Sequence, residues 1–178
     1  IGSKHFVPTL SSARDLLGIC FSQRDFALLA KNVRPLYLLN TSHPPESLPK
    51  KLHAYLQQGI AHDVDKQYKC RIREPWYTVP SVWPAHALML RQAGDYPRLV
   101  HLSKPCTSTD TIHRVRWNHR ALGKRHVVSF LNTWTLIACE LTGRSYGGGV
   151  LELMPSEANS LPLPAPSRTL ELHFDEID

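Results

Sequence analysis

Residues 142–150, Thr-Gly-Arg-Ser-Tyr-Gly-Gly-Gly-Val, combine groups that could do three kinds of chemistry. The Gly-x-Ser-x-Gly pattern centred on Ser145 is the one in which many hydrolases present a nucleophilic serine. The glycine run could instead hold a phosphate, because glycine lets backbone amides approach an anion closely. Arg144 and Tyr146 are also residue types that contact the phosphates and bases of nucleic acids. The elements that flank the segment decide among these functions.

The flanking sequence disfavours the first two functions. Apolar residues recur every three or four positions through residues 124–142, which predicts a helix before the loop, and residues 150–154 predict a strand after it. A nucleophile elbow needs the opposite order of elements. A phosphate loop needs a helix N-terminus, whereas this loop follows a helix C-terminus. We therefore expect either a turn whose Arg144, Ser145 and Tyr146 contact a polyanion, or a plain turn in which glycines relieve steric strain.

Two further stretches combine cations with aromatic or small polar side chains. Cations alternate with apolar residues over residues 69–73, so an extended chain would place the cations on one face. A Thr-Ser-Thr-Asp turn leads into a second basic segment. Each stretch alone is also typical of a solvated strand face or an ordinary turn, and the four tryptophans are more typical of a core than of base stacking. The candidate polyanion-contacting residues are Lys69, Arg71, Arg73, Trp76, Tyr77, Ser108, Thr109, Asp110, His113, Arg114, Arg116, Arg144, Ser145 and Tyr146.

All three stretches lie in the most basic part of the chain. The total net charge is +6, but residues 69–146 hold 12 Lys or Arg against 4 Asp or Glu, whereas residues 147–178 hold 1 against 6. Such a local excess favours a polyanionic partner, with nucleic acid first, because neutralising phosphates releases counterions. A generally basic surface is the plainer interpretation of the same charge.

Signs of a catalytic or metal site are weak. Neither a His-Glu-x-x-His segment nor a Cys-x-x-Cys pair occurs, and the four cysteines are far apart, which is typical of reduced, unreactive thiols. A nuclease that uses His113 or His119 as a general base stays open as an alternative. The chain has no apolar run near the roughly 20 residues that span a bilayer and no leader-like start, so we expect a soluble, cytoplasmic protein.

The elements expected around these residues mix helices and strands. Apolar spacing predicts helices at residues 47–59, with Ser47 as a cap, and at 124–142, and a brief helix opening at 155–157. Strands are expected at residues 34–39, 69–73, 86–91, 98–102, 111–117 and 150–154. Because helices and strands do not alternate regularly, we predict an α+β fold with a mixed or antiparallel sheet and a few packed helices. We expect a single compact recognition domain over residues 1–164, best supported over 69–164, and a tail, 165–178, that could add an edge strand.

Three blocks of the sequence resemble one protein family. The first covers residues 69–81, with Lys-Cys-Arg-Ile-Arg-Glu-Pro-Trp-Tyr and Val-Pro-Ser, and the second covers residues 107–115, Thr-Ser-Thr-Asp-Thr-Ile-His-Arg-Val. The third covers residues 142–164, with the glycine loop, Pro-Ser-Glu and Leu-Pro-Leu-Pro. In this order they resemble the C-terminal portion of TaqI-like, adenine-specific DNA methyltransferases of restriction-modification systems.

The resemblance implies a target-recognition domain that binds double-stranded DNA through the residues named above. In such enzymes a separate N-terminal domain of the same chain binds S-adenosylmethionine and methylates a flipped-out adenine. The sequence departs from the whole enzyme, since its only Pro-Pro is Pro44–Pro45, outside any Asn/Asp-Pro-Pro-Tyr/Phe motif, and it has no glycine-rich cofactor loop after a strand. We therefore expect no catalytic residue, metal or cofactor in this chain, and S-adenosylmethionine as the cofactor of the parent enzyme.

The start at Ile1, without a methionine, agrees with a piece of a longer protein. Three other functions stay open. The chain could be the recognition domain or specificity subunit of a restriction nuclease, an independent hydrolase or nuclease, or a protein–protein adaptor with a basic surface.

Overall fold

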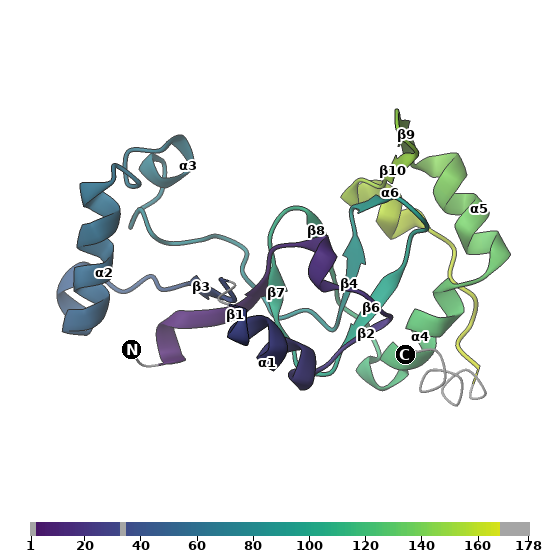
Figure 1. The fold of residues 1–178 in the computed structure, drawn as a ribbon, viewed down its shortest axis with the longest axis horizontal. Helices are drawn as coiled ribbons and strands as arrows, with labels where there is room; N and C mark the ends of the chain where they lie inside the picture. The colour runs from purple at the N-terminus through teal and green to yellow at the C-terminus, as the bar shows by residue number, and fades with distance from the viewer. Residues whose placement is uncertain (1–2, 33–34, 168–178) are drawn as a thin grey trace. The chain divides into compact units, whose positions relative to one another are not determined.

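The computed structural model describes residues 3–32 and 35–167. Contacts along the chain divide it into two units, which we call unit 1 (Ile1–Pro8 and Tyr37–Trp83) and unit 2 (Thr9–Leu36 and Pro84–Asp178). Helices and strands follow one another irregularly in the chain, so the predicted α+β class is confirmed (Figure 1). Most of the predicted tail, 165–178, lies outside the described residues.

Unit 1 combines a short antiparallel strand pair with one long helix. β1 (Phe6–Leu10) pairs with β3 (Tyr37–Leu39), and α2 (Lys50–Ala61) follows. The apolar core of this unit consists of Leu48, Leu52, Leu56 and Tyr77, with Phe6, Leu39 and Trp76 packed against it. Leu52 and Leu56 are one helical turn apart on α2 and provide its buried face, whereas Tyr55, which the apolar spacing also included, is 53% exposed.

Two predictions in unit 1 were wrong in detail. The helix predicted from Ser47 begins at Lys50, because Ser47 ends a 3-10 turn, η3 (Pro45–Ser47), and does not cap α2. The strand predicted over residues 69–73 is instead a single helical turn, α3 (Tyr68–Arg71), followed by further turns. The amides of Cys70 and Arg71 donate to the carbonyl of Gln67, at 2.9 and 2.8 Å, and not to a neighbouring strand.

The main sheet of unit 2 has four strands in the order β2-β6-β4-β8. They are β2 (Cys20–Phe21), β6 (Leu99–Leu102), β4 (Ala87–Leu90) and β8 (Ile112–Val115). β2 runs parallel to β6, and β4 is antiparallel to both β6 and β8, so the sheet is mixed. The strands predicted at 86–91, 98–102 and 111–117 are thus confirmed, each one or two residues shorter at its ends.

Unit 2 also contains the helices α1 (Gln23–Lys31) and α4 (Gly123–Phe130). A capping box starts α1, because the side chains and amides of Ser22 and Asp25 exchange hydrogen bonds. The core of unit 2 consists of Ile19, Ala87, Met89, Leu99, Val127, Val128, Phe130, Cys139, Leu151 and Leu153. Short 3-10 turns occur at η1 (Ser3–His5), η2 (Ala13–Asp15) and η4 (Arg120–Leu122).

The helix predicted over residues 124–142 is broken into α4 and α5 (Thr133–Thr142). Asn132 causes the break, since its side chain accepts the amide of Thr135 at 3.0 Å and donates to the carbonyl of Ser129 at 2.6 Å. This N-cap restarts the helix in a new direction. Trp134, which the sequence placed in a core with the other tryptophans, is consequently 69% exposed.

A second, smaller sheet and two short elements complete unit 2. β10 (Val150–Glu152) pairs antiparallel with both β5 (Gln92–Ala93) and β9 (Arg144–Tyr146). α6 (Pro155–Ser160) follows β10, as the sequence predicted. β7 (Thr107–Ser108) runs parallel to the last two residues of β1. The β9–β10 hairpin lies beyond the C-terminal end of α5 (Figure 1).

Burial distinguishes the four cysteines. Burial raises the pKa of Cys106 to about 12 and that of Cys139 to about 11, and both side chains are buried, whereas Cys20 and Cys70 are half-buried. None of the helices in the described part of the chain combines the length and hydrophobicity needed to cross a lipid bilayer.

Candidate nucleic-acid interface

The predicted loop at residues 142–150 forms a hairpin with an exposed tip. β9 and β10 pair with Arg144 opposite Glu152 and Tyr146 opposite Val150, which leaves a loop of three glycines, residues 147–149. Gly148 and Gly149 have φ of 84° and 76°, a left-handed backbone that L side chains rarely adopt. The tip therefore presents backbone without side chains to whatever it meets.

The two sides of β9 carry different groups. Because side chains alternate along a strand, Arg144 and Tyr146 share one face and Ser145 lies on the other. All three residues are exposed, and Tyr146 is 50% exposed. Nε of Arg144 donates to Oε1 of Glu157 at 3.2 Å, and its side chain is still 57% exposed. The hairpin thus presents a guanidinium and an aromatic ring on one face and a hydroxyl on the other.

The base of the hairpin is fixed by Glu152, which is only 5% exposed. Its carboxylate accepts hydrogen bonds from Nε of Arg91 at 2.8 Å and from Nε2 of Gln92 at 3.3 Å. A hydrogen bond from the Tyr146 side chain is the main cause that holds the pKa of Glu152 below 4.5, with smaller contributions from Gln92 and Arg91. One charged group therefore ties together β5, β9 and β10.

Several residues of the second candidate stretch, residues 107–116, form hydrogen bonds that hold strands together. The hydroxyl of Ser108 donates to the carbonyl of Ile112 at 2.8 Å, and Nη1 of Arg114 donates to Oγ1 of Thr107 at 3.3 Å. Burial lowers the pKa of Arg114. Nε2 of His113 donates to the carbonyl of Leu153 at 2.6 Å, which links β8 to the residue after β10. The candidates of this stretch that remain exposed are Thr109, Asp110 and Arg116.

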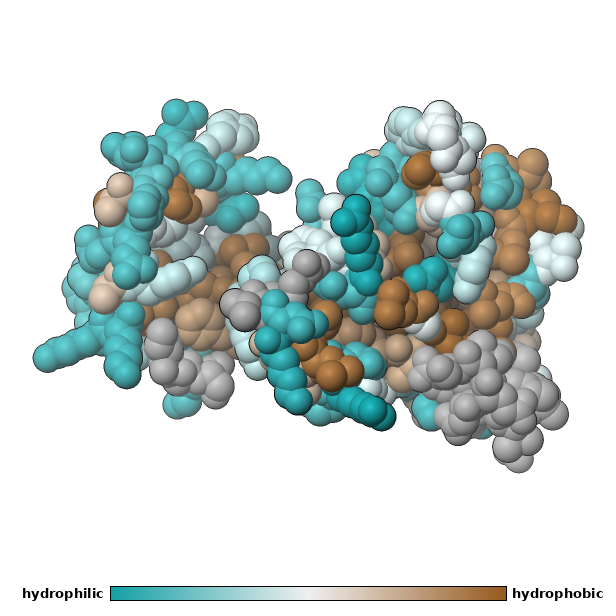
Figure 2. Space-filling view, in the orientation of Figure 1, coloured by the Kyte–Doolittle hydropathy of each residue, from teal (hydrophilic) through white to brown (hydrophobic). Residues whose placement is uncertain are grey.

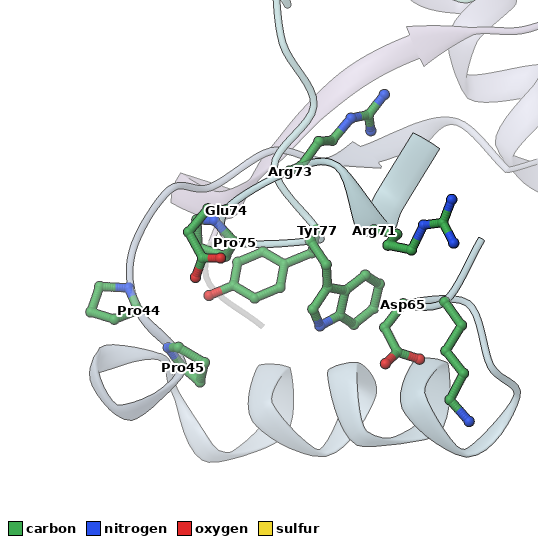
Figure 3. Close-up of a pocket in the computed structure, with 10 residues that line it drawn as sticks. Pro44, Pro45, Asp65, Arg71, Arg73, Glu74, Pro75 and Tyr77 are labelled. Carbon is green, nitrogen blue, oxygen red and sulfur yellow. The ribbon is translucent and has the colours of Figure 1, made fainter. Parts of the chain in front are cut away.

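Four of the five candidates from residues 69–77, all except Lys69, line a hollow of about 660 Å³ in unit 1 (Figure 3). Its lining residues are Pro44, Pro45, Asp65, Lys66, Arg71, Arg73, Glu74, Pro75, Trp76 and Tyr77. Arg71 and Arg73 extend away from Tyr77 (Figure 3). The hollow therefore has cations on its rim and two aromatic rings in its wall.

The aromatic wall of this hollow is held in place by neighbouring groups. Tyr77 is buried, and its hydroxyl donates to the carbonyl of His43. Burial is the main cause that raises its pKa. Trp76 packs edge-on against Tyr77, with ring centroids 5.6 Å apart. Arg71 lies over the ring of Tyr68, 5.9 Å from its centroid, and Lys69 is exposed on α3. Tyr77 is therefore a wall residue and core residue at once.

The structure thus divides the candidates between the two units. Lys69, Arg71, Arg73, Trp76 and Tyr77 belong to unit 1, and the other nine belong to unit 2. The sequence missed Arg91 and Glu152, which position the hairpin, and Lys66 and Asp65, which line the hollow. A carboxylate inside the apolar run Val-Leu-Glu-Leu was the available signal for Glu152, because an acidic residue in a buried strand needs a partner. Among the described residues, no three His, Cys, Asp or Glu side chains gather as a metal site would require.

Comparison with known proteins identifies the family. Residues 2–178 match the family model of Type II methyltransferase M.Eco57I, C-terminal domain. The Type II methyltransferase M.AccI of Acinetobacter calcoaceticus is 24% identical over 169 residues, which cover 89% of this chain and 30% of that protein. The chain therefore spans less than a third of this relative, and no solved structure matches it significantly. By its sequence and over nearly its whole length, the chain belongs to the family of C-terminal domains of Type II methyltransferases.

Proposed function

We propose that the chain is the DNA target-recognition domain of an S-adenosylmethionine-dependent, adenine-specific methyltransferase whose catalytic portion is not part of this sequence. The observation that carries the proposal is the β9–β10 hairpin. It projects an exposed guanidinium from a base that a buried carboxylate fixes, and the half-exposed ring of Tyr146 lies on the same face with its hydroxyl bonded to that carboxylate. Arginine forks onto guanine edges or phosphates, and a glycine tip lets the backbone approach a groove closely.

The proposal divides labour between the two groups of candidates. Lys69, Arg71 and Arg73 supply phosphate contacts, which give affinity to any sequence and weaken with salt. Arg144, Tyr146 and Ser145 supply register and base readout, because they are exposed side chains on a paired strand next to a glycine tip. Arg114 and Ser108 act mainly by holding β7 and β8, given the hydrogen bonds that they make.

S-adenosylmethionine is assigned to the catalytic portion of the parent enzyme. The glycine run is the part of this sequence most like a cofactor loop, and it lies at an exposed hairpin tip after the C-terminus of α5. The exposed tip does not enclose an adenine ring, as a cofactor pocket must, and the proposal therefore places the cofactor outside this chain.

The test compares arginine variants of the full-length methyltransferase on DNA. A pool of random duplexes first identifies the recognised site, and affinities are then measured for that site and for single mismatches at several salt concentrations. Arg144→Ala is expected to reduce discrimination at one position by roughly tenfold. Arg71→Ala is expected to weaken binding to all duplexes alike and to reduce the salt slope by about 1.

Arg24→Ala is the matched control, because Arg24 is an exposed arginine of unit 2 that lies on α1, outside both groups. It should leave affinity and discrimination nearly unchanged. Failure of the wild-type protein to bind duplex DNA at low salt would refute the proposed function. Equal behaviour of the Arg144 and Arg71 variants would refute the division of labour.

A further inference from the structure

Helix α5 exposes three large apolar side chains on one face. Trp134 is 69% exposed, Ile137 47% and Leu141 80%, and their spacing of three and four residues places them in one stripe. The helix buries a different face, with Thr135 and Cys139, against unit 2. Apolar surface is visibly gathered over α5 in Figure 2. We call these three residues the α5 stripe.

The α5 stripe is larger than the scattered apolar residues that any surface carries. Contiguous exposed apolar patches usually mark interaction sites. The buried face of α5 carries Thr135 and Cys139, so its largest apolar side chains lie on the exposed face. The stripe therefore calls for an occupant.

Charge argues that the occupant is protein and not DNA. The ten residues of α5 include one charged side chain, Glu140, and no Lys, Arg or His. Surfaces that bind the DNA backbone need cations, because phosphate contacts supply most of the affinity. An apolar stripe that includes a tryptophan and no cation matches the core of a protein interface. The recognition surface proposed above and the α5 stripe are thus chemically distinct.

The length of the related protein indicates which protein segment covers the α5 stripe. The matching segment of M.AccI makes up 30% of that methyltransferase, so more than two thirds of such a protein lies outside the family domain. We propose that the α5 stripe is the surface on which the remaining, catalytic portion of the parent methyltransferase docks. This proposal depends on the proposed function only in assuming that such a portion exists.

The α5 stripe is close in the chain to the β9–β10 hairpin, so docking at the stripe would affect the position of the hairpin. Leu141 is three residues before Arg144, and a single residue, Gly143, separates α5 from β9. Gly143 is packed tightly, since a Cβ there would lie 2.7 Å from Cδ1 of Leu151 and 2.8 Å from the carbonyl of Cys139. A partner that grips α5 therefore also orients the recognition hairpin. Docking at the stripe would set where the catalytic portion stands relative to the bases being read.

The test is hydroxyl-radical footprinting of the full-length protein without DNA. Each oxidation rate is divided by the intrinsic rate of that amino acid, and Leu17, which is 87% exposed in unit 2, serves as the internal reference. The proposal predicts that Trp134 and Leu141 are oxidised several-fold more slowly than Leu17. Leu141→Gln should raise the oxidation of Trp134, whereas the matched variant Leu17→Gln should leave it unchanged. Both variants keep the net charge and alter a position that is exposed in this chain, so both are expected to fold.

Three results would overturn the proposal. If Trp134 is oxidised as fast as an exposed tryptophan, nothing covers the stripe. Protection that appears only on adding a duplex means that DNA is the occupant. Protection that disappears on dilution means that a second copy of the chain covers it. Since no DNA is present in the main measurement, a failure of DNA recognition leaves the footprint unaffected, and the two proposals fail separately.

Discussion

The carboxylate of Glu152 accepts a hydrogen bond from Nε of Arg91 at 2.8 Å, and this pair secures the hairpin that carries Arg144 and Tyr146. Glu152 is buried, whereas the Arg91 side chain is 31% exposed. A buried carboxylate with several donors is stable only while they remain, because an unpaired buried charge is costly. The geometry of the candidate site thus depends on a residue that does not itself reach outward.

Glu152→Gln should therefore lower the melting temperature and loosen the hairpin. The amide cannot accept as many hydrogen bonds as the carboxylate and loses the charge that attracts Arg91. We expect a drop of several degrees in thermal unfolding, followed by circular dichroism, and faster amide exchange in β9. Glu140→Gln, at an exposed position on α5, is the control and should change neither. An unchanged melting temperature would show that the Glu152 network does not stabilise unit 2.

The sequence predicted well those elements whose signal is local. β4 and β6 were found because apolar runs fill them, and both are buried in the centre of a sheet. The glycine loop was predicted to follow a helix and precede a strand, and α5 and β10 flank it in that way. The predicted turn is in fact strand β9 followed by a loop of residues 147–149, but Arg144, Ser145 and Tyr146 are exposed as a turn would leave them, and their contact with DNA stays a prediction. These predictions needed no knowledge of distant contacts.

The errors arose where two local signals compete or where the contact is distant. Residues 69–73 alternate like a strand, but no strand pairs with them and the amides close a helical turn on Gln67. Asn132 fits a helical pattern, yet its side chain caps the next helix and turns Trp134 outward. The Arg91–Glu152 pair joins residues 61 positions apart, so sequence spacing could not reveal it. Tertiary contacts decided each case.

The Glu152 network should also make the stability of unit 2 depend on pH. The pKa of Glu152 is lowered from 4.5, chiefly by the hydrogen bond from Tyr146, so the folded state binds its proton more weakly than the unfolded state does. The stabilisation is therefore complete above 4.5 and is lost as pH falls through the lowered pKa. We expect the difference in melting temperature between wild type and Glu152→Gln to be constant above about pH 5 and to shrink below it. A difference that grows on acidification would contradict the assigned direction.

Gly143→Ala should destabilise the junction between α5 and β9. The added Cβ would come within 2.7 Å of Cδ1 of Leu151 and 2.8 Å of a backbone carbonyl, and the carbonyl cannot move without disturbing α5. Overpacking of this kind costs about 1–3 kcal/mol. Gly94→Ala is the matched control, since nothing lies within 4 Å of its Cβ. Urea unfolding of the two variants measures the difference, and equal midpoints would show that the junction adapts.

The glycine tip of the hairpin should matter for binding more than for folding. Gly148 has φ of 84° and no atom within 4 Å of a Cβ, so Gly148→Ala meets only backbone strain, about 1–2 kcal/mol. The added methyl would nevertheless stand between the tip and a nucleic-acid groove. We expect Gly148→Ala to weaken binding to the recognised duplex beyond what its modest loss of stability explains. Gly147→Ala is the control for backbone strain, because that Cβ is equally open while its φ is not positive. Both variants must first be shown to be folded. If both then bind the duplex as tightly as the wild type does, the tip does not contact the DNA. In that case Arg144 and Tyr146 contact the DNA only from the side of the hairpin.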